Sequence, residues 1–143
     1  METLRQISDL DLFVSDRASA AIIGDDFSRV VSCIKDAPTA ANCKTLVVCP
    51  SGKTAHIWEV GDLDQITTIV MMRLEVGGDV LIHCRSGVSR STVAAAAVLL
   101  KMGHVDNVKE ALKLASWEGR KPASQSVGSL KRWWAAQNQT SLF

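Results

Sequence analysis

The sequence predicts an α/β domain with a small central mixed sheet flanked by helices. Short apolar or β-branched runs come early in the chain, and longer runs with apolar residues at helical spacing come later. This order of strands, then helix, strand and several helices is typical of helices packed on a small sheet. The 143 residues include 47% hydrophobic side chains and show no repeat or shift in composition, so we expect a single domain over residues 1–143.

The first half of the chain is expected to supply the strands. Turn residues at positions 50–52 favour a strand on either side of them, and the two segments could pair as a hairpin or be a strand and a loop. A short helix is expected at Ser19–Ile23. The predicted strands are Asp11–Val14, Arg29–Ile34, Thr45–Cys49 and Ala55–Val60.

The second half is expected to supply the helices and one buried strand, Val80–Cys84. A helix over Leu63–Val76 has apolar residues at spacings of three and four, with Asp62 or Asp64 as N-cap and a Gly-Gly pair as its stop. Three more helices are predicted at about Ser91–Met102, Asp106–Trp117 and Val127–Gln137.

Charge and hydropathy exclude several classes of partner. The 16 Lys and Arg residues nearly balance the 15 Asp and Glu residues, which gives no reason to expect nucleic acid or an anionic membrane as a partner. Trp133 and Trp134 beside two basic residues are better explained as helix core than as a base-stacking site. The longest apolar run, Val93–Leu100, is much shorter than the roughly 20 residues of a membrane span. No signal peptide is expected, so we predict a location in the cytoplasm, with the nucleus as an alternative. We also expect the protein to be a monomer.

The cysteines do not form a metal-binding or disulfide pattern. There is no CxxC pair and no ligand-like spacing with the three histidines, so neither a metal nor a cofactor is expected. Reduced thiols fit a cytosolic protein, and each thiol is then either core filler or a reactive group. The cysteines are Cys33, Cys43, Cys49 and Cys84.

One cysteine lies where a buried strand passes into a helix, in the segment VLIHCRSGVSRST at residues 80–92. Small residues at Ser86, Gly87 and Ser89 allow successive backbone amides to turn toward one anion. The start of the helix adds unpaired N–H groups, and Arg90 can hold two oxygens of a tetrahedral oxyanion. These groups favour a thiolate at Cys84, so the spacing predicts a nucleophile beside an anion site.

The residues His83, Cys84, Arg90 and Ser91, in the pattern HCxxxxxR-S, resemble the signature loop of cysteine-dependent protein phosphatases. The form HCRSGVSRST is especially similar to the dual-specificity branch. The segments LDLFVSD, RVVSCI and KTLVVCPSGKTAHIWEVGD resemble further parts of that family in the same order. The resemblance therefore covers most of the chain and implies a tyrosine-phosphatase-like fold.

The resemblance implies a role for each residue of the loop. Cys84 would attack phosphorus, and Ser91, which could also be a helix N-cap, would help the thiolate leave again. His83 would orient the loop and bias the thiolate. Arg90 and the amides of the loop would hold the phosphate oxygens. The phosphate-binding set is Arg85, Ser86, Gly87, Val88, Ser89 and Arg90.

The family takes a proton for the leaving group from an upstream Asp, and two features here depart from its pattern. Asp62 is our first candidate, Asp64 the second and Glu59 the third, although Asp62 lies closer to Cys84 than the family pattern implies and could be a plain N-cap. Ser126 and Ser129 stand where the resemblance would place an Asn and a Phe, so it gives no basis for contact between this segment and the loop.

The resemblance implies a metal-independent phosphatase that acts on phosphotyrosine and on phosphoserine or phosphothreonine in proteins through a cysteinyl-phosphate. One alternative is a phosphate-binding pseudophosphatase without turnover. Another is a phosphatase for a non-protein phosphoester, either a phosphoinositide or an RNA 5′ end. Arg85 is the only further cation inside the loop to bind such a polyanion.

Overall fold

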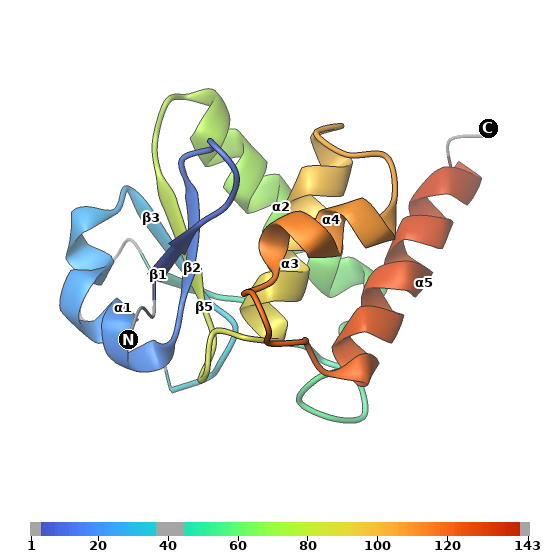
Figure 1. The fold of residues 1–143 in the computed structure, drawn as a ribbon, viewed down its shortest axis with the longest axis horizontal. Helices are drawn as coiled ribbons and strands as arrows, with labels where there is room; N and C mark the ends of the chain where they lie inside the picture. Colours follow the sequence, from blue (N-terminus) through green and yellow to red (C-terminus); the bar gives the residue numbers. More distant parts are fainter. Residues whose placement is uncertain (1–3, 37–44, 141–143) are drawn as a thin grey trace.

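The computed structural model describes residues 4–36 and 45–140, which form a sheet with helices on both faces (Figure 1). The sheet has five strands in the order β1-β2-β5-β3-β4. Only the edge pair β1 and β2 is antiparallel, so the sheet is mixed. The strands are β1 (Leu4–Gln6), β2 (Leu12–Ser15), β3 (Arg29–Ser32), β4 (Thr45–Val47) and β5 (Val80–His83).

The helices divide unevenly between the two faces of the sheet. Helix α1 lies on one face together with the short 3-10 helix η1. Helices α2 and α3 pack on the opposite face, and α4 and α5 pack against α3 on the same side (Figure 1). The helices are α1 (Arg17–Ile23), η1 (Gly24–Asp26), α2 (Val60–Glu75), α3 (Arg90–Lys101), α4 (Val108–Ala115) and α5 (Ser124–Thr140). The predicted α/β class is therefore confirmed.

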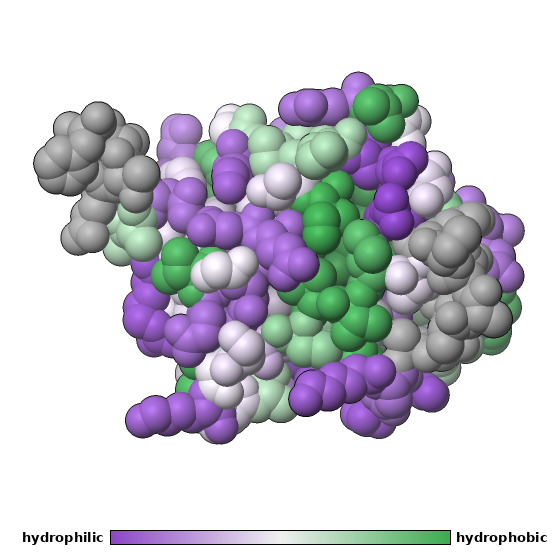
Figure 2. Space-filling model, turned by 180° about the vertical axis from the view of Figure 1, so that it is seen from behind, coloured by the Kyte–Doolittle hydropathy of each residue, from purple (hydrophilic) through white to green (hydrophobic). Residues whose placement is uncertain are grey.

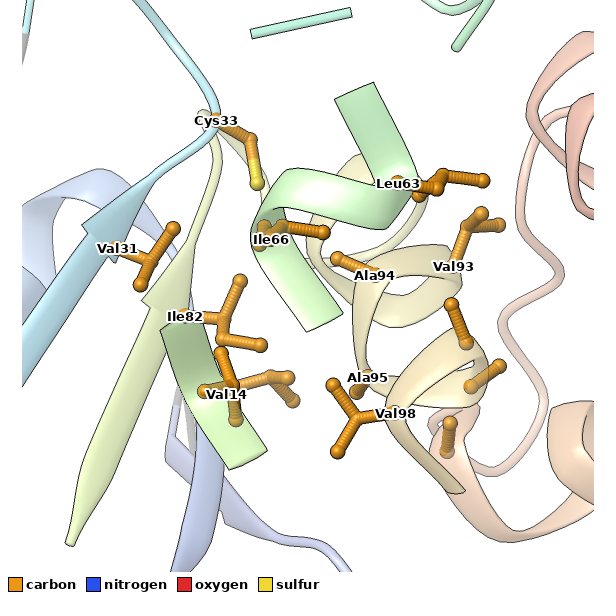
Figure 3. Packing of buried hydrophobic residues seen from close by; sticks show 14 of the residues in the cluster. Val14, Val31, Cys33, Leu63, Ile66, Ile82, Val93, Ala94, Ala95 and Val98 are labelled. Carbon is orange, nitrogen blue, oxygen red and sulfur yellow. The ribbon is translucent and has the colours of Figure 1, made fainter. Parts of the chain in front are cut away.

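The main core lies between the sheet and helices α2 and α3. Side chains of alternate strand residues, such as Val14 and Ile82, face Ile66 of α2 and Val98 of α3 (Figure 3). The intervening residues face α1, as Leu81 does. Every residue of β5 is buried, so helices cover both faces of this strand. The strand leads directly into residues 84–90.

The predicted strand Ala55–Val60 is wrong. The chain from residue 51 to residue 59 forms turns, and Gly52 N donates to the carbonyl of Ile57 at 2.8 Å. Trp58 is buried, but its backbone N–H donates to Ser129 Oγ of α5 at 2.9 Å instead of to a neighbouring strand. The apolar residues of this segment are buried against a helix. A local hydrophobic pattern cannot distinguish this kind of burial from burial in a sheet.

Helix α2 begins three residues before the predicted start. Its N-cap is Glu59, and Asp62 lies inside the first turn, where its carboxylate accepts from Glu59 N at 2.9 Å. The prediction of Asp62 or Asp64 as N-cap is therefore wrong, because a carboxylate at the third helical position can also satisfy the N-cap amide.

The remaining predicted elements are present with small shifts at their ends. Helix α3 begins one residue early, with Ser89 and not Ser91 as its N-cap, and α4 begins after Asn107. Helix α5 is longer than predicted at both ends. Strand β1 was not predicted, because its three residues are too few to show an alternating pattern.

The face turned away in Figure 1 carries apolar surface, which Figure 2 shows in green. The exposed apolar side chains of the described residues include Val47 of β4 and Met72 and Val76 of α2. Among the described residues, no helix is long and apolar enough to cross a membrane.

Candidate active site

The predicted nucleophile lies at the start of a loop between β5 and α3, the Cys84 loop (residues 84–90). Strand β5 ends at His83, and Arg90 is the first residue of α3. The Cys84 side chain is 1% exposed. The structure thus gathers His83, Cys84, Arg90 and Ser91 around one strand-to-helix junction, as the spacing predicted.

Two groups of the loop and helix contact the sulfur of Cys84. The backbone N–H of Gly87 donates to Cys84 Sγ at 3.3 Å, and the Oγ of Ser91 shares a hydrogen bond with Sγ over the same distance. Both contacts suit a sulfur that carries negative charge, because N–H and O–H donors stabilise a thiolate. Ser91 is thereby placed to hydrogen-bond the sulfur directly.

Contacts from outside the loop fix its backbone. Trp117 Nε1 donates to the carbonyl of Gly87 at 2.8 Å. Ala123 N donates to Ser89 Oγ at 2.8 Å, so the segment before α5 does contact the loop, although the resemblance gave no basis for it. On the other side, Arg17 N donates to the carbonyl of Arg85 at 3.2 Å. A loop tied down at several points keeps its amides aimed before a ligand arrives.

Arg90 lines a pocket of about 400 Å³ at the mouth of the Cys84 loop. Among the described residues, its Nε is buried and has no hydrogen-bond partner. A guanidinium at the positive end of a helix is unfavourable unless an anion lies near it. Arg90 is therefore a group that an oxyanion ligand would satisfy.

His83 is fully buried beneath the loop. Within the described chain, neither of its ring nitrogens has a hydrogen-bond partner. Burial lowers the pKa of His83 to about 4, although the adjacent backbone of Cys84 acts in the opposite direction. The ring is therefore neutral at pH 7 and adds no positive charge beside Cys84, which corrects the expected contribution of His83 to the thiolate.

The buried His83 predicts a loss of stability in acid. Its folded-state pKa of about 4 lies below its ordinary value of 6.5, so the unfolded chain binds the proton more readily. The free energy of unfolding should fall as the pH drops from 6.5 to about 4, by roughly 3 kcal/mol from this residue. Urea unfolding at several pH values across this range measures the slope of the unfolding free energy against pH. The H83Q variant should lose that part of the slope, and an identical slope in both proteins would contradict the prediction.

The three candidate proton donors all have other partners or lie at the helix end. Asp62 Oδ2 accepts from the N and Oγ of Ser51 at 2.8 and 2.7 Å, as well as from Glu59 N. Asp64 Oδ1 accepts from Trp133 Nε1 at 2.9 Å and from Gln137 at 3.0 Å. Glu59 is the exposed N-cap of α2. None of the three lines the pocket that contains Arg90.

The pocket contains residues that the sequence did not single out. Lys35 and Asp36 follow β3, and Lys53 lies in the turn-rich segment before α2. Asp36 Oδ2 lies 3.6 Å from both Arg17 and Arg85. No local motif marks these residues, because parallel strands bring the ends of distant segments together at one edge of the sheet.

Two cysteines, Cys33 and Cys49, line the pocket that contains Arg90. Cys33 is fully buried, and burial raises the pKa of its thiol well above the ordinary value. The pKa of Cys49 is also raised, mainly by burial. Both thiols are therefore protonated at neutral pH. Cys43 lies outside the described residues.

Solved structures with the same arrangement identify the fold. Human DUSP28 matches with a TM-score of 0.78 at 17% identity, over 96% of this chain and 97% of that one. The fold is that of the cysteine-dependent phosphatases. PTPMT1 in complex with PI(5)P matches with a TM-score of 0.75 at 13% identity, over 98% and 99% of the two chains. A human tyrosine phosphatase-like serine/threonine/tyrosine-interacting protein matches with a TM-score of 0.72 at 19% identity, over 94% and 97%.

Comparison of the sequence alone finds no such relationship. No family model matches the chain, and no curated protein matches it. At identities of 13–19% the structural similarity establishes the fold, so the chemistry has to be argued from the site itself.

Proposed function

We propose that the chain is a metal-independent phosphatase that forms a cysteinyl-phosphate on Cys84. One observation supports this most directly. Arg90 has a buried, unpartnered Nε within the described chain, and it lines a pocket beside a loop whose Gly87 amide points at the sulfur. Within residues 84–90 the loop thus brings together a thiol, an arginine and a backbone amide aimed at the sulfur, and such a set can bind and attack a tetrahedral phosphate.

In the first step, Cys84 Sγ attacks phosphorus, the S–P bond forms, and the ester P–O bond breaks. The electron pair of that bond goes to the leaving oxygen. Arg90 and the loop amides hold the three equatorial oxygens as their charge spreads in the transition state. The amides are held for this task by the contacts from Trp117 and Ala123.

In the second step, water attacks the phosphocysteine and the S–P bond breaks. The departing sulfur takes the electron pair, and the hydrogen bond from Ser91 Oγ stabilises the thiolate as it forms. The released product is inorganic phosphate.

We propose phosphotyrosine and phosphoserine or phosphothreonine in proteins as the substrates, following the resemblance of the loop to the dual-specificity branch. The test is turnover of p-nitrophenyl phosphate in EDTA, with acid quenching and mass spectrometry for a phosphoryl group on Cys84. A protein with no turnover and no adduct would reject the proposal.

The source of the leaving-group proton makes a separate prediction. Asp62 remains our sequence-based candidate, but the three hydrogen bonds that its Oδ2 accepts disfavour it as a donor. We therefore expect the wild type to hydrolyse aryl phosphates at least about 100-fold faster than alkyl phosphates, because a phenolate leaves without a proton. Among the proposed substrates, phosphotyrosine should then be the fast one, and phosphoserine and phosphothreonine the slow ones. Steady-state kinetics with p-nitrophenyl phosphate and β-glycerophosphate measure this ratio.

The D62N variant separates a catalytic from a structural role of this carboxyl. If Asp62 only holds the start of α2, the substitution should change aryl and alkyl turnover by the same factor and lower the unfolding free energy. A selective loss of alkyl turnover would instead identify Asp62 as the proton donor. The D36N variant applies the same comparison to the carboxylate that lines the pocket.

A binding protein without turnover is the second candidate. It is favoured by the engagement of Asp62 and Asp64 with other partners, and the fold is shared with a human protein described as phosphatase-like and serine/threonine/tyrosine-interacting. This candidate predicts phosphopeptide binding by a wild type that has no hydrolytic activity in the assay above. A phosphoinositide is a further candidate substrate, because PTPMT1 with the same fold was crystallised with PI(5)P.

A further inference from the structure

The pocket in front of the Cys84 loop is rich in positive charge. Four cationic side chains line it, and among the described residues only one carboxylate does, that of Asp36. The cations come from three separate segments: the end of β3, the turns before α2, and the loop itself. They are Lys35, Lys53, Arg85 and Arg90.

This charge is not balanced within the described part of the chain. Asp36 pairs with Arg17 and Arg85 at 3.6 Å, whereas no ion pair involves Lys35 or Lys53. Both lysine side chains are exposed at the pocket. One phosphate bound by Arg90 and the loop amides would leave these two cations without an anion, so the pocket suits a ligand with more than one phosphate.

The lining is also poorly suited to a phenyl ring. No aromatic residue lines the pocket within the described ranges, and the whole chain contains no tyrosine. A phosphotyrosine ring would find lysines and small residues where a stacking partner would stabilise it. The pocket therefore recognises charge better than it recognises an aromatic ring.

The contacts of three carboxylates limit which leaving groups can depart at this site. This second argument is independent of the charge and lining of the pocket. Asp62 and Asp64 accept hydrogen bonds from other groups, and Asp36 pairs with two guanidinium groups at 3.6 Å, so all three carboxylates already have partners other than a leaving group. A substrate whose leaving group departs as a stable anion needs no proton from them. A phosphate oxygen of a phosphoanhydride is such a leaving group, and an alkoxide is not.

We propose that this site hydrolyses the terminal phosphoanhydride of a di- or triphosphate. The proposal rests on the proposed function, because Cys84 and Arg90 act in it as they do on an ester. Lys35, Lys53 and Arg85 bind the inner phosphates, whose charge increases when the terminal group is removed. The same cations thus bind the substrate and stabilise the leaving group.

The reaction balances without a metal or a proton donor. Cys84 Sγ forms a bond to the terminal phosphorus, and the bond from that phosphorus to the bridging oxygen breaks. The bridging oxygen keeps the electron pair and leaves as part of the shortened phosphate chain. Water then displaces the thiolate from phosphocysteine, and its proton remains on the released orthophosphate or passes to solvent.

The test compares inorganic tripolyphosphate with p-nitrophenyl phosphate, both in EDTA, by release of orthophosphate and of p-nitrophenol. We expect wild-type turnover of tripolyphosphate that is lost in C84S. The double variant K35A/K53A should lower the ratio of the two kcat/KM values, tripolyphosphate over ester, about 30-fold, since each lysine meets a phosphate that the ester lacks. The double variant K101A/K109A removes the same charge at exposed positions outside the pocket and should leave the ratio unchanged.

The outcomes separate this inference from the proposed function. Turnover of p-nitrophenyl phosphate without turnover of tripolyphosphate overturns the inference and leaves the proposed function standing. An unchanged ratio in K35A/K53A also overturns it. Absence of turnover with both substrates overturns both. ATP and a 5′-triphosphorylated oligoribonucleotide, assayed in the same way, distinguish a free nucleotide from an RNA end as the source of the triphosphate.

Discussion

Replacing Cys84 by serine should lower kcat for p-nitrophenyl phosphate at least about 1,000-fold. A serine hydroxyl is a weak nucleophile unless a neighbouring base takes its proton. The adjacent residue His83 is a candidate base, but within the described chain its ring nitrogens have no hydrogen-bond partner, so no hydrogen bond joins them to the sulfur. The hydroxyl would therefore lie in the position of the sulfur without the means to attack. Steady-state kinetics in EDTA give kcat for both proteins.

The same variant should still bind inorganic phosphate, because Arg90 and the loop amides remain. Isothermal titration measures this binding and separates a lost nucleophile from a lost fold. The S91A variant provides the matched control, since it removes only the hydroxyl that contacts Cys84 Sγ at 3.3 Å. It should show a near-stoichiometric burst of p-nitrophenol, because the phosphocysteine forms but releases its thiolate slowly. A C84S protein that keeps a tenth of the wild-type kcat would exclude Cys84 as the nucleophile.

The Cys84 loop could be predicted from the sequence because its chemistry is local. Strand, thiol, small residues, arginine and helix follow one another within residues 80–92, so their order in the chain fixes their arrangement in space. Strand β5 and helix α3 were predicted on either side of it to within one residue. The anion site that we expect at this junction is predicted from the same short segment.

The walls of the pocket could not be predicted in this way. Lys35, Asp36 and Lys53 reach it only because β3 lies beside β5 in the sheet and because the segment before α2 forms turns. In the sequence, Asp62 is the first candidate proton donor because it follows the strand-like segment Ala55–Val60 and precedes a helix. The structure has no strand there, since α5 buries Trp58, and Asp62 lies in the first turn of α2, where its carboxylate accepts from the N-cap amide. Substrate preference depends on these distant segments and therefore needs the structure.

Replacing Gly87 by alanine should cost roughly 3 kcal/mol or more of unfolding free energy and lower kcat/KM about 100-fold. Gly87 has φ +77°, where a side chain is strained, and an added Cβ would lie 2.8–2.9 Å from backbone atoms of Ser15 and Asp16. The backbone of β2 cannot yield as a flexible side chain would, so the loop itself has to shift. Such a shift moves the amide that donates to Cys84 Sγ and the carbonyl that accepts from Trp117.

Gly103 provides the matched control for this prediction. It has the same φ of +77°, but an added Cβ would meet no atom within 4 Å. The G103A variant should therefore cost only the backbone strain, about 1–2 kcal/mol, and leave kcat/KM unchanged. Urea unfolding and steady-state kinetics on both variants separate strain from collision. Equal losses of stability in G87A and G103A would mean that a collision of the added Cβ with the backbone at the end of β2 does not contribute to the loss in G87A. Because the Gly87 amide and carbonyl lie between that contact and the sulfur, only a collision at Gly87 should reduce stability and turnover together.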